Sequence, residues 1–221
     1  QHFAARFAAK EAVFKAIGDN PDIGWKDIKI LNDKQRIGLK YYEDLLERIP
    51  RNEMEQHRDR ILGSLPEEMK EFQTELVGSF RRNAESSGDI DVLIRVPKNI
   101  PSKMVCQYFY DYVQHLIDKK YIIEILALGE HKCMAICRIG GGKARRLDLL
   151  MTPDEEYAYS LLYFTGSDRF NVAFRQYTLQ KGYTLNEHRL TPLNDDVPIP
   201  PYMTSEKDIF RFLKLRYIDP S

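Results

Sequence analysis

Two aspartates stand two residues apart in the segment 89–96, where their side chains could act together. The segment reads Asp-Ile-Asp-Val-Leu-Ile-Arg-Val and alternates as a strand does, so Ile90 and Val92 face one side while Asp89 and Asp91 share the other. At this spacing the two residues lie roughly 6–7 Å apart along the backbone. Two negative charges this close raise the pKa of one carboxyl group or attract a cation.

A third acid, Asp148, lies in the segment 144–151, which also has the pattern of a strand. If this strand neighbours 89–96, three carboxylates converge. Such oxygen ligands suit Mg²⁺, which binds a few carboxylates together with water and substrate phosphates. On spacing alone an alternative stays open, in which the acids lie at exposed strand ends and bind nothing.

The residues just before the aspartate pair favour a phosphate-binding site. Gly78-Ser79 opens a turn that can present backbone N–H groups and a hydroxyl, and Ser86-Ser87-Gly88 forms another. Arg81 and Arg82 add guanidinium donors. Small residues and arginines beside a metal-binding acid pair can hold a triphosphate. The sequence contains no GxxxxGK[ST] motif, so a P-loop is excluded.

Hydrophobic periodicity predicts the elements that must position these residues. Helices are expected over 3–17, 34–48, 52–76 (interrupted near 63–66), 101–120, 153–162, 168–181 and 206–215. Strands are expected over 89–96, 121–128, 132–139 and 144–151, with short strands around 184–190. The segment 163–167 falls between two helices. A strand, a helix and then consecutive strands predict a mixed sheet with helices against it, an α+β fold.

Composition sets the outer bounds on function. The 221 residues are 43% hydrophobic and 30% charged, which is typical of a globular protein. Lysine and arginine total 33, equal to the 33 acidic residues. Taken alone, this balance argues against a simple nucleic-acid coat or a basic membrane-surface module. Apolar stretches are too short for a membrane span and there is no signal-peptide pattern, so no membrane partner is expected.

The three cysteines, Cys106, Cys133 and Cys137, do not make a disulfide framework, and an odd number suits a reducing compartment. Cys133 and Cys137 stand four residues apart without a CxxC motif, and the five histidines form no HxxxH pair. Packed free thiols are therefore expected in preference to a structural zinc site.

Several ordered segments together resemble the family X DNA polymerases, the group of DNA polymerases beta and lambda. The signature is GSFRR at 78–82, followed by SGDIDV at 87–92. It continues through RRLD at 145–148, YFTGSDRFN at 163–171, GYTLNEH at 182–188 and SEKDIF at 205–210, with QRIGLKYY at 35–42 and RIPR at 48–51 upstream. The resemblance runs from about residue 33 to the end of the chain.

The resemblance implies a role for each matching position. Asp89, Asp91 and Asp148 are the implied catalytic residues and metal ligands, the first two for both of two Mg²⁺ ions and Asp148 for the ion beside the primer 3′-OH; Mn²⁺ can substitute. The implied nucleotide-binding residues are Arg48, Ser79, Arg82, Ser87 and Gly88 at the phosphates, Tyr163, Phe164 and Gly166 at the sugar, and Asp168 and Asn171 at the base. Arg146 and Arg175 are the implied DNA contacts.

The same resemblance implies a fold and an activity. The fold is a nucleotidyltransferase palm with a mixed sheet at 51–154, flanked by a helical DNA-binding subdomain at 1–50 and a small α+β nucleotide-selection subdomain at 155–221. The activity is template-directed addition of deoxynucleotides to a primer 3′-OH by two-metal transfer, for short-gap filling in DNA repair, including base excision repair. The implied partners are gapped or primed DNA and deoxynucleoside triphosphates, bound by a monomer in the nucleus or another intracellular reducing compartment.

Three positions depart from the family pattern. Asn83 replaces the glycine that commonly follows the arginine pair. Val172 stands where the beta enzyme has a template-stacking lysine, and Leu150 where it has an arginine that pairs with a catalytic aspartate in the open form. A beta-type open/closed switch is therefore not expected. Residues 1–32 show no helix-hairpin-helix glycine pattern and leave no room for the family's amino-terminal lyase domain, so its presence upstream stays open.

Two alternatives to templated synthesis remain. One is a template-independent terminal transferase of the same superfamily, which would carry a long loop between the two strands after the palm helix; Gly129-Glu-His131 instead predicts a tight turn. The other is a non-catalytic DNA-binding module, which would be expected to lack one of the three acids.

Overall fold

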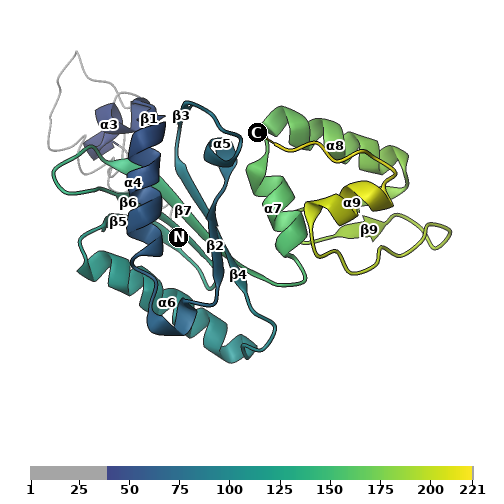
Figure 1. The fold of residues 1–221 in the computed structure, drawn as a ribbon, viewed down its shortest axis with the longest axis horizontal. Helices are drawn as coiled ribbons and strands as arrows, with labels where there is room; N and C mark the ends of the chain where they lie inside the picture. Colours follow the sequence, from purple (N-terminus) through teal and green to yellow (C-terminus); the bar gives the residue numbers. More distant parts are fainter. Residues whose placement is uncertain (1–38, 221) are drawn as a thin grey trace, which may run out of the picture. The chain divides into compact units, whose positions relative to one another are not determined.

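The computed structural model describes residues 39–220 (Figure 1). The chain divides into two compact units, 1–42 and 43–221, and only residues 39–42 of the first are described. The helix expected over 3–17 and the first part of that expected over 34–48 lie outside the described residues. The end of the latter contains the short helix α3, Tyr42–Leu46.

A five-stranded mixed sheet forms the centre of the second unit (Figure 1). Its strand order is β2-β4-β7-β6-β5; β4 and β7 are parallel, and the other neighbours are antiparallel. The strands are β2 (Gln73–Leu76), β4 (Ile90–Val96), β5 (Ile122–Leu128), β6 (Lys132–Cys137) and β7 (Arg145–Pro153). The predicted α+β class with a mixed sheet is confirmed.

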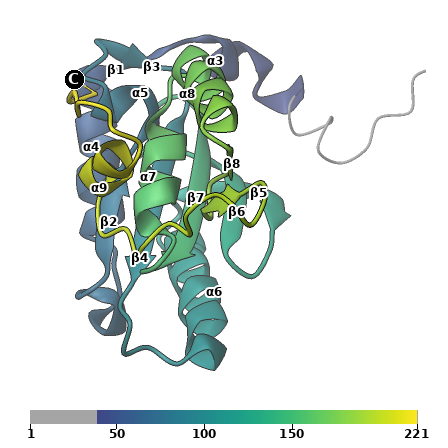
Figure 2. The same ribbon diagram turned by 90° about the vertical axis from the view of Figure 1, so that its right-hand side faces the viewer.

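Both faces of β4 are covered by helices. Ile90 and Val92 join a core with residues of α4 (Arg51–Leu62) and α6 (Ser102–Asp118). Leu93, on the opposite face, is also fully buried and packs with Tyr157 of α7 (Tyr157–Thr165). Figure 2 shows α7 over the sheet. The strand carries apolar residues on both faces, more than simple alternation predicts, because helices pack against both faces of the sheet at this strand.

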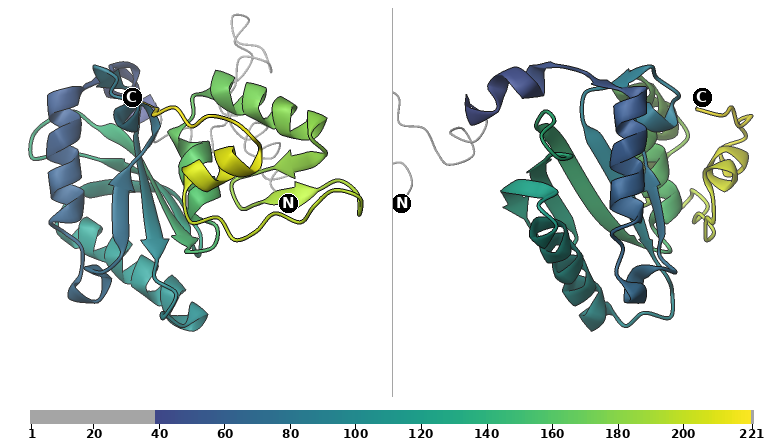
Figure 3. Two further views of the ribbon diagram at one scale, coloured as in Figure 1. Left: turned by 45° about the vertical axis from the view of Figure 1, so that its right-hand side comes forward. Right: turned by 60° about the vertical axis from the view of Figure 1, so that its left-hand side comes forward.

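The carboxy-terminal elements surround a second core. They are α7, α8 (Asp168–Gln180), β8 (Tyr183–Leu185), β9 (Leu190–Pro192) and α9 (Glu206–Phe212), shown side by side in the left view of Figure 3. Phe174 lies between Phe170 of the same helix and Phe210 of α9, with its ring centroid 5.1 Å from that of each. Among the helices of residues 39–220, none is long and apolar enough to cross a membrane.

The prediction of a helix over 52–76 is wrong in its carboxy-terminal part. Residues 73–76, expected at the end of a helix, form the edge strand β2, because they pair antiparallel with β4 over Gln73–Leu76. Helix α4 ends at Leu62, and only the short 3₁₀ turn η1 (Glu67–Met69) lies between it and β2. This pairing is a long-range interaction, which the local periodicity of a polar four-residue strand does not reveal.

Two further segments are helical where turns or linkers are expected. Tyr163, Phe164 and Thr165 form the last turn of α7, which ends at Gly166 with a positive φ of 65°. Residues 78–81 form the short helix α5 (Gly78–Arg81), not only a turn. Helix α5 is followed by β3 (Ser86–Ser87), which pairs with β1 (Ile49–Pro50) in a small separate sheet.

Candidate active site

The three acids singled out in the sequence lie on the two central parallel strands. Asp91 of β4 is the register partner of Asp148 of β7, so the two side chains project from adjacent strands at the same level. Asp89 directly precedes β4. The two strands are therefore neighbours, which is the condition under which the three carboxylates converge.

The acids influence one another electrostatically. Burial, and then the charges of Asp89 and Asp148, raises the pKa of Asp91 to about 7. Burial also raises the pKa of Asp148, with Asp89 acting in the same direction and Arg146 and Lys132 opposing it. The Arg146 guanidinium donates a hydrogen bond to Asp89 Oδ2 and forms an ion pair with the same carboxylate.

The carboxylates are suited to divalent cations. Asp148 Oδ1 is buried and has no hydrogen-bond partner among the described residues. A buried acceptor without a donor is costly, and a hard cation bound by oxygen would satisfy it. Positive charge bound between the acids would offset the repulsion from Asp89 and Asp148, which adds to the effect of burial on the pKa of Asp91. The donor set, oxygen only, fits Mg²⁺ or Mn²⁺.

Gly78 brings the helix α5 close to the acids. Its φ is +60°, in the left-handed region that favours glycine. A Cβ at this position would lie only 2.3 Å from Asp91 Oδ2. Glycine is therefore required here both by the backbone conformation and by the space that Asp91 occupies.

The expected phosphate-binding residues are held together by α5 and β3. Ser79 Oγ donates to Ser87 Oγ at 2.9 Å. Arg48 binds Ser86 twice, from Nε to Oγ at 2.7 Å and from Nη2 to the carbonyl oxygen at 2.6 Å. Gly88 is exposed and lies beside the Arg48 guanidinium. The backbone and side chains of this segment thus form one connected group.

The two arginines of α5 and its cap have different partners. Arg82 donates to the carbonyl oxygen of Thr165 and remains beside Gly166. Arg81 forms a bidentate bridge to the buried Glu206 at 2.9 and 2.7 Å and also binds Thr165 Oγ1 at 2.6 Å. The expectation that Arg81 adds a free donor for phosphate is therefore wrong, since Arg81 links α5 to α7 and α9. No sequence signal identifies Glu206 as its partner.

The residues expected at the sugar and base meet around the end of α7. Asn171 Nδ2 donates to the Tyr163 carbonyl oxygen at 2.8 Å, and the Arg175 guanidinium lies 4.9 Å from the centroid of the Tyr163 ring. Tyr163 and Phe164 meet edge to face with centroids 5.0 Å apart. Asp168 lies exposed in the first turn of α8. These side chains form a second group, joined to the phosphate segment through Arg82.

Arg145 is a structural residue that the sequence does not distinguish from its neighbour. Its side chain is almost completely buried and binds Glu53 through Nε and Nη2 at 2.6 and 2.8 Å. Arg146, the next residue on β7, points to the opposite face and reaches Asp89. Strand alternation therefore assigns one arginine to the core and the other to the site.

Comparisons with known proteins match two parts of the chain to families of known proteins. The DNA polymerase beta palm family matches residues 48–154, and the DNA polymerase beta thumb family matches residues 160–221. Among curated relatives, the chain is 32% identical to DNA polymerase lambda of Rattus norvegicus over 210 residues, which are 86% of the chain and 35% of that protein.

Two further relatives are more distant. The chain is 26% identical over 210 residues to DNA polymerase lambda of Arabidopsis thaliana, covering 86% of the chain and 39% of that protein. It is 28% identical over 229 residues to DNA nucleotidylexotransferase of Xenopus laevis, covering 88% of the chain and 45% of that protein. The chain thus spans less than half the length of each of these relatives.

Proposed function

Because the chain belongs to the family X DNA polymerases, we propose that it adds deoxynucleotides to a primer 3′-OH under the direction of a template strand. The observation that carries this proposal is the convergence of Asp89, Asp91 and Asp148 on β4 and β7, beside the α5–β3 segment. The reaction forms a bond between the 3′-oxygen and the α-phosphorus and breaks the bond to the β-phosphate, so that pyrophosphate leaves.

The three acids would hold two divalent ions, Mg²⁺ by preference with Mn²⁺ able to substitute. When bound, such ions lower the pKa of the attacking hydroxyl and neutralise the triphosphate. Asp148 accepts the proton of the 3′-hydroxyl, and its unpartnered Oδ1 supports this role. Arg146 holds Asp89 in place and contacts the DNA.

The α5–β3 segment binds the β- and γ-phosphates in this proposal. Ser79 and Ser87 present hydroxyls, Gly88 a backbone N–H group, and Arg82 a guanidinium. Arg48 is connected to the same segment through Ser86. Charge-assisted hydrogen bonds to phosphate oxygens are among the stronger ones in proteins, which suits a group that must hold a highly charged ligand.

The end of α7 and the start of α8 select the nucleotide. Tyr163, Phe164 and Gly166 line the sugar, where the Tyr163 backbone and ring leave no space for a ribose 2′-hydroxyl. Asp168 and Asn171 lie against the incoming base, and Arg175 contacts the template. The bond between Asn171 and the Tyr163 carbonyl supports a shared role in positioning the nucleotide.

Templated synthesis is favoured over terminal transfer by the connection between β5 and β6. Gly129 N donates to the Lys132 carbonyl oxygen at 2.8 Å, which closes a tight turn with no long loop. A relative named as a nucleotidylexotransferase makes terminal transfer the second candidate. We place the enzyme in short-gap filling during DNA repair, including base excision repair. It would act as a monomer in the nucleus or another intracellular reducing compartment, with the subdomains 1–50, 51–154 and 155–221 in the roles given above.

Primer extension with and without a template strand tests the proposal. We expect incorporation of the complementary deoxynucleotide on gapped and primed DNA, and little extension of the same primer alone. Equal extension of the single-stranded primer, without dependence on the templating base, would contradict templated synthesis and favour terminal transfer.

A further inference from the structure

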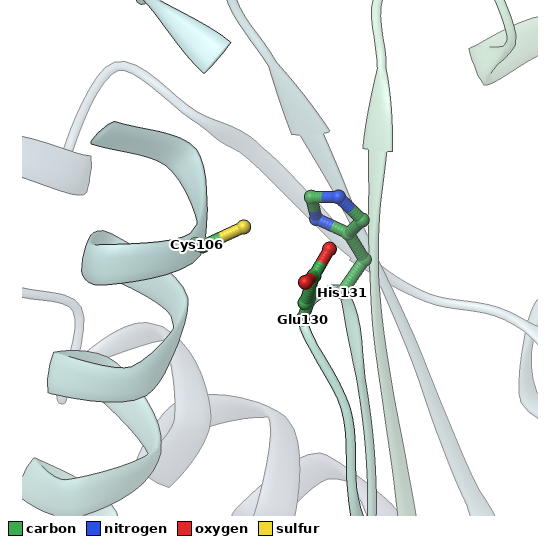
Figure 4. A group of neighbouring side chains, drawn as sticks. All are labelled: Cys106, Glu130 and His131. Carbon is green, nitrogen blue, oxygen red and sulfur yellow. The ribbon is translucent and has the colours of Figure 1, made fainter. Parts of the chain in front are cut away.

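A second group of potential metal ligands lies outside the proposed active site. Cys106 of α6 and the adjacent residues Glu130 and His131 place one ligand atom each within 4.8 Å of one another (Figure 4). In Figure 4 the Cys106 thiol points toward the other two side chains across the gap between helix and sheet. Cys106 is half-buried, and the other two are exposed.

Rigid elements position all three side chains. Glu130 and His131 occupy the centre of the β5–β6 turn, which is closed by the bond from Gly129 N to Lys132 O at 2.8 Å. The His131 carbonyl oxygen also accepts a hydrogen bond from Met151 N of β7 at 2.8 Å. Cys106 follows Val105, whose side chain is buried in the main core and fixes α6 against the sheet.

The group is separate from the three acids. Met151, the backbone partner of His131, lies three residues beyond Asp148 on β7, a distance of roughly 10 Å along a strand. His131 also lines a cavity of about 250 Å³ together with Val105 and Met151. A ligand bound here would therefore not compete directly for the catalytic carboxylates.

A thiolate, an imidazole and a carboxylate form a ligand set typical of zinc. Zn²⁺ binds sulfur at about 2.3 Å and nitrogen or oxygen at about 2.0–2.2 Å in a tetrahedral arrangement. Ligand atoms in such a tetrahedron are roughly 3.3–3.8 Å apart. The three ligand atoms here lie within 4.8 Å of one another, which is about 1 Å more than the longest of these separations. Rotation of the exposed Glu130 and His131 side chains can close this difference without moving the core. The soft thiolate discriminates against Mg²⁺.

The geometry points to a Zn²⁺ site formed by Cys106, Glu130 and His131, with water as the fourth ligand. The bound ion links the first half of α6 to the β5–β6 turn. Because the three ligands are brought together only in the folded protein, Zn²⁺ binding is also expected to raise the free energy of unfolding. The site does not depend on the proposed polymerase activity.

Cobalt substitution tests the site directly. The full chain is titrated with Co²⁺ in the presence of a reductant and excess Mg²⁺, which occupies the acid group. We expect a thiolate-to-cobalt charge-transfer band that saturates at one equivalent and disappears when Zn²⁺ is added. The acids Asp89, Asp91 and Asp148 cannot produce this band because they offer only oxygen.

Three variants complete the test. Cys106→Ser is expected to abolish the band, and His131→Asn to weaken Zn²⁺ binding at least roughly tenfold. His188→Asn serves as the control, because His188 is an exposed histidine of the carboxy-terminal region, and it should leave the titration unchanged. Absence of the band in the unaltered protein, its persistence in Cys106→Ser, or equal Zn²⁺ affinity of His131→Asn and the unaltered protein would each overturn the proposal.

Discussion

At the scale of single residues, the candidate site concentrates charge that the folded chain alone does not neutralise. Asp91 has a pKa of about 7 because it is buried beside Asp89 and Asp148, and Asp148 has a buried oxygen without a partner. Arg146 forms an ion pair with Asp89, and its charge opposes the raised pKa values of Asp91 and Asp148. Carboxyl groups with strongly shifted pKa values are common at functional sites, where a bound ligand compensates their charge. Such groups lower the stability of the protein in the absence of the ligand.

Tyr163 provides the first prediction. Tyr163→Ala is expected to reduce discrimination against ribonucleotides by roughly tenfold or more, because the ring that blocks the 2′-hydroxyl is removed. Single-turnover incorporation of the matched ribo- and deoxynucleoside triphosphates measures the ratio. Tyr163→Phe is the matched control and should preserve discrimination, since it keeps the ring. An unchanged ratio in Tyr163→Ala would place the sugar gate elsewhere.

His57 provides a prediction about pH. Burial lowers the pKa of His57 to about 4, although the neighbouring Glu53 opposes this shift. In the unfolded chain the imidazole takes up its proton near pH 6.5, whereas in the folded protein it does so only near pH 4. The unfolded state therefore binds more protons between these values, and the free energy of unfolding falls as pH drops from 6.5 toward 4.

Urea unfolding at pH 7 and pH 5 measures this effect. We expect the His57 contribution to cost about 2 kcal/mol over that interval. His57→Gln should lose this part of the pH dependence, and the exposed control His188→Gln should retain it. The same pH dependence in all three proteins would show that His57 is not the group responsible.

At the scale of elements, the short helix α5 determines how closely the phosphate-binding segment approaches the acids. The helix starts at Gly78, and the preceding Val77 N donates a hydrogen bond to the Asp91 carbonyl oxygen of β4 at 2.9 Å. At its other end, Arg81 is fixed by Glu206 of α9. The element is thus held on both sides, so a small displacement affects both the acids and the nucleotide-selecting residues.

Gly78→Ala is expected to destabilise the protein by about 2 kcal/mol or more and to lower incorporation by roughly 100-fold, because the new methyl group displaces Asp91. Thermal or urea unfolding and gap-filling kinetics measure the two effects. Gly140→Ala is the control for backbone strain, because Gly140 also has a positive φ but a Cβ there would meet no atom within 4 Å. Gly141→Ala is the control with neither a positive φ nor a close contact. If Gly78→Ala behaves like Gly140→Ala, close approach to Asp91 is not important.

Elements were predictable from the sequence where local pattern and tertiary contact agree. The strand at 89–96 alternates, and α6 carries a continuous apolar face, so both are found near their predicted positions. The strand β2 was not predictable, because its only strong support is pairing with β4. The motifs also pointed to Asp91 and Asp148, but the bridge from Arg81 to Glu206 and the cluster at Cys106 join residues too distant in sequence to show a pattern.

At the scale of the whole molecule, the balanced charge remains informative. The chain has 33 basic and 33 acidic residues, yet belongs to a family of DNA polymerases. Three acids at the candidate site lower the total, and divalent ions bound there would reverse the local sign. The equal numbers of basic and acidic residues therefore predict weak non-specific binding to DNA through few phosphate contacts, and low processivity.

The salt dependence of DNA binding tests this expectation. Four phosphate contacts would lower affinity for gapped DNA roughly 100-fold between 50 and 200 mM salt, and fewer contacts would lower it less. Fluorescence anisotropy with labelled gapped DNA measures the slope. Tight binding that salt does not weaken would contradict a neutral chain that holds DNA through a small number of phosphate contacts.

Asp89, Asp91 and Asp148 are proposed to carry out nucleotidyl transfer, and single-turnover filling of a one-nucleotide gap by Asp148→Asn tests this role. Asp195→Asn, in an exposed loop, is the matched control. We expect Asp148→Asn to lose at least roughly 1000-fold in rate while it folds and binds gapped DNA within a few-fold of the unaltered protein. Incorporation by Asp148→Asn at the rate of the unaltered protein would contradict the assignment of these carboxylates.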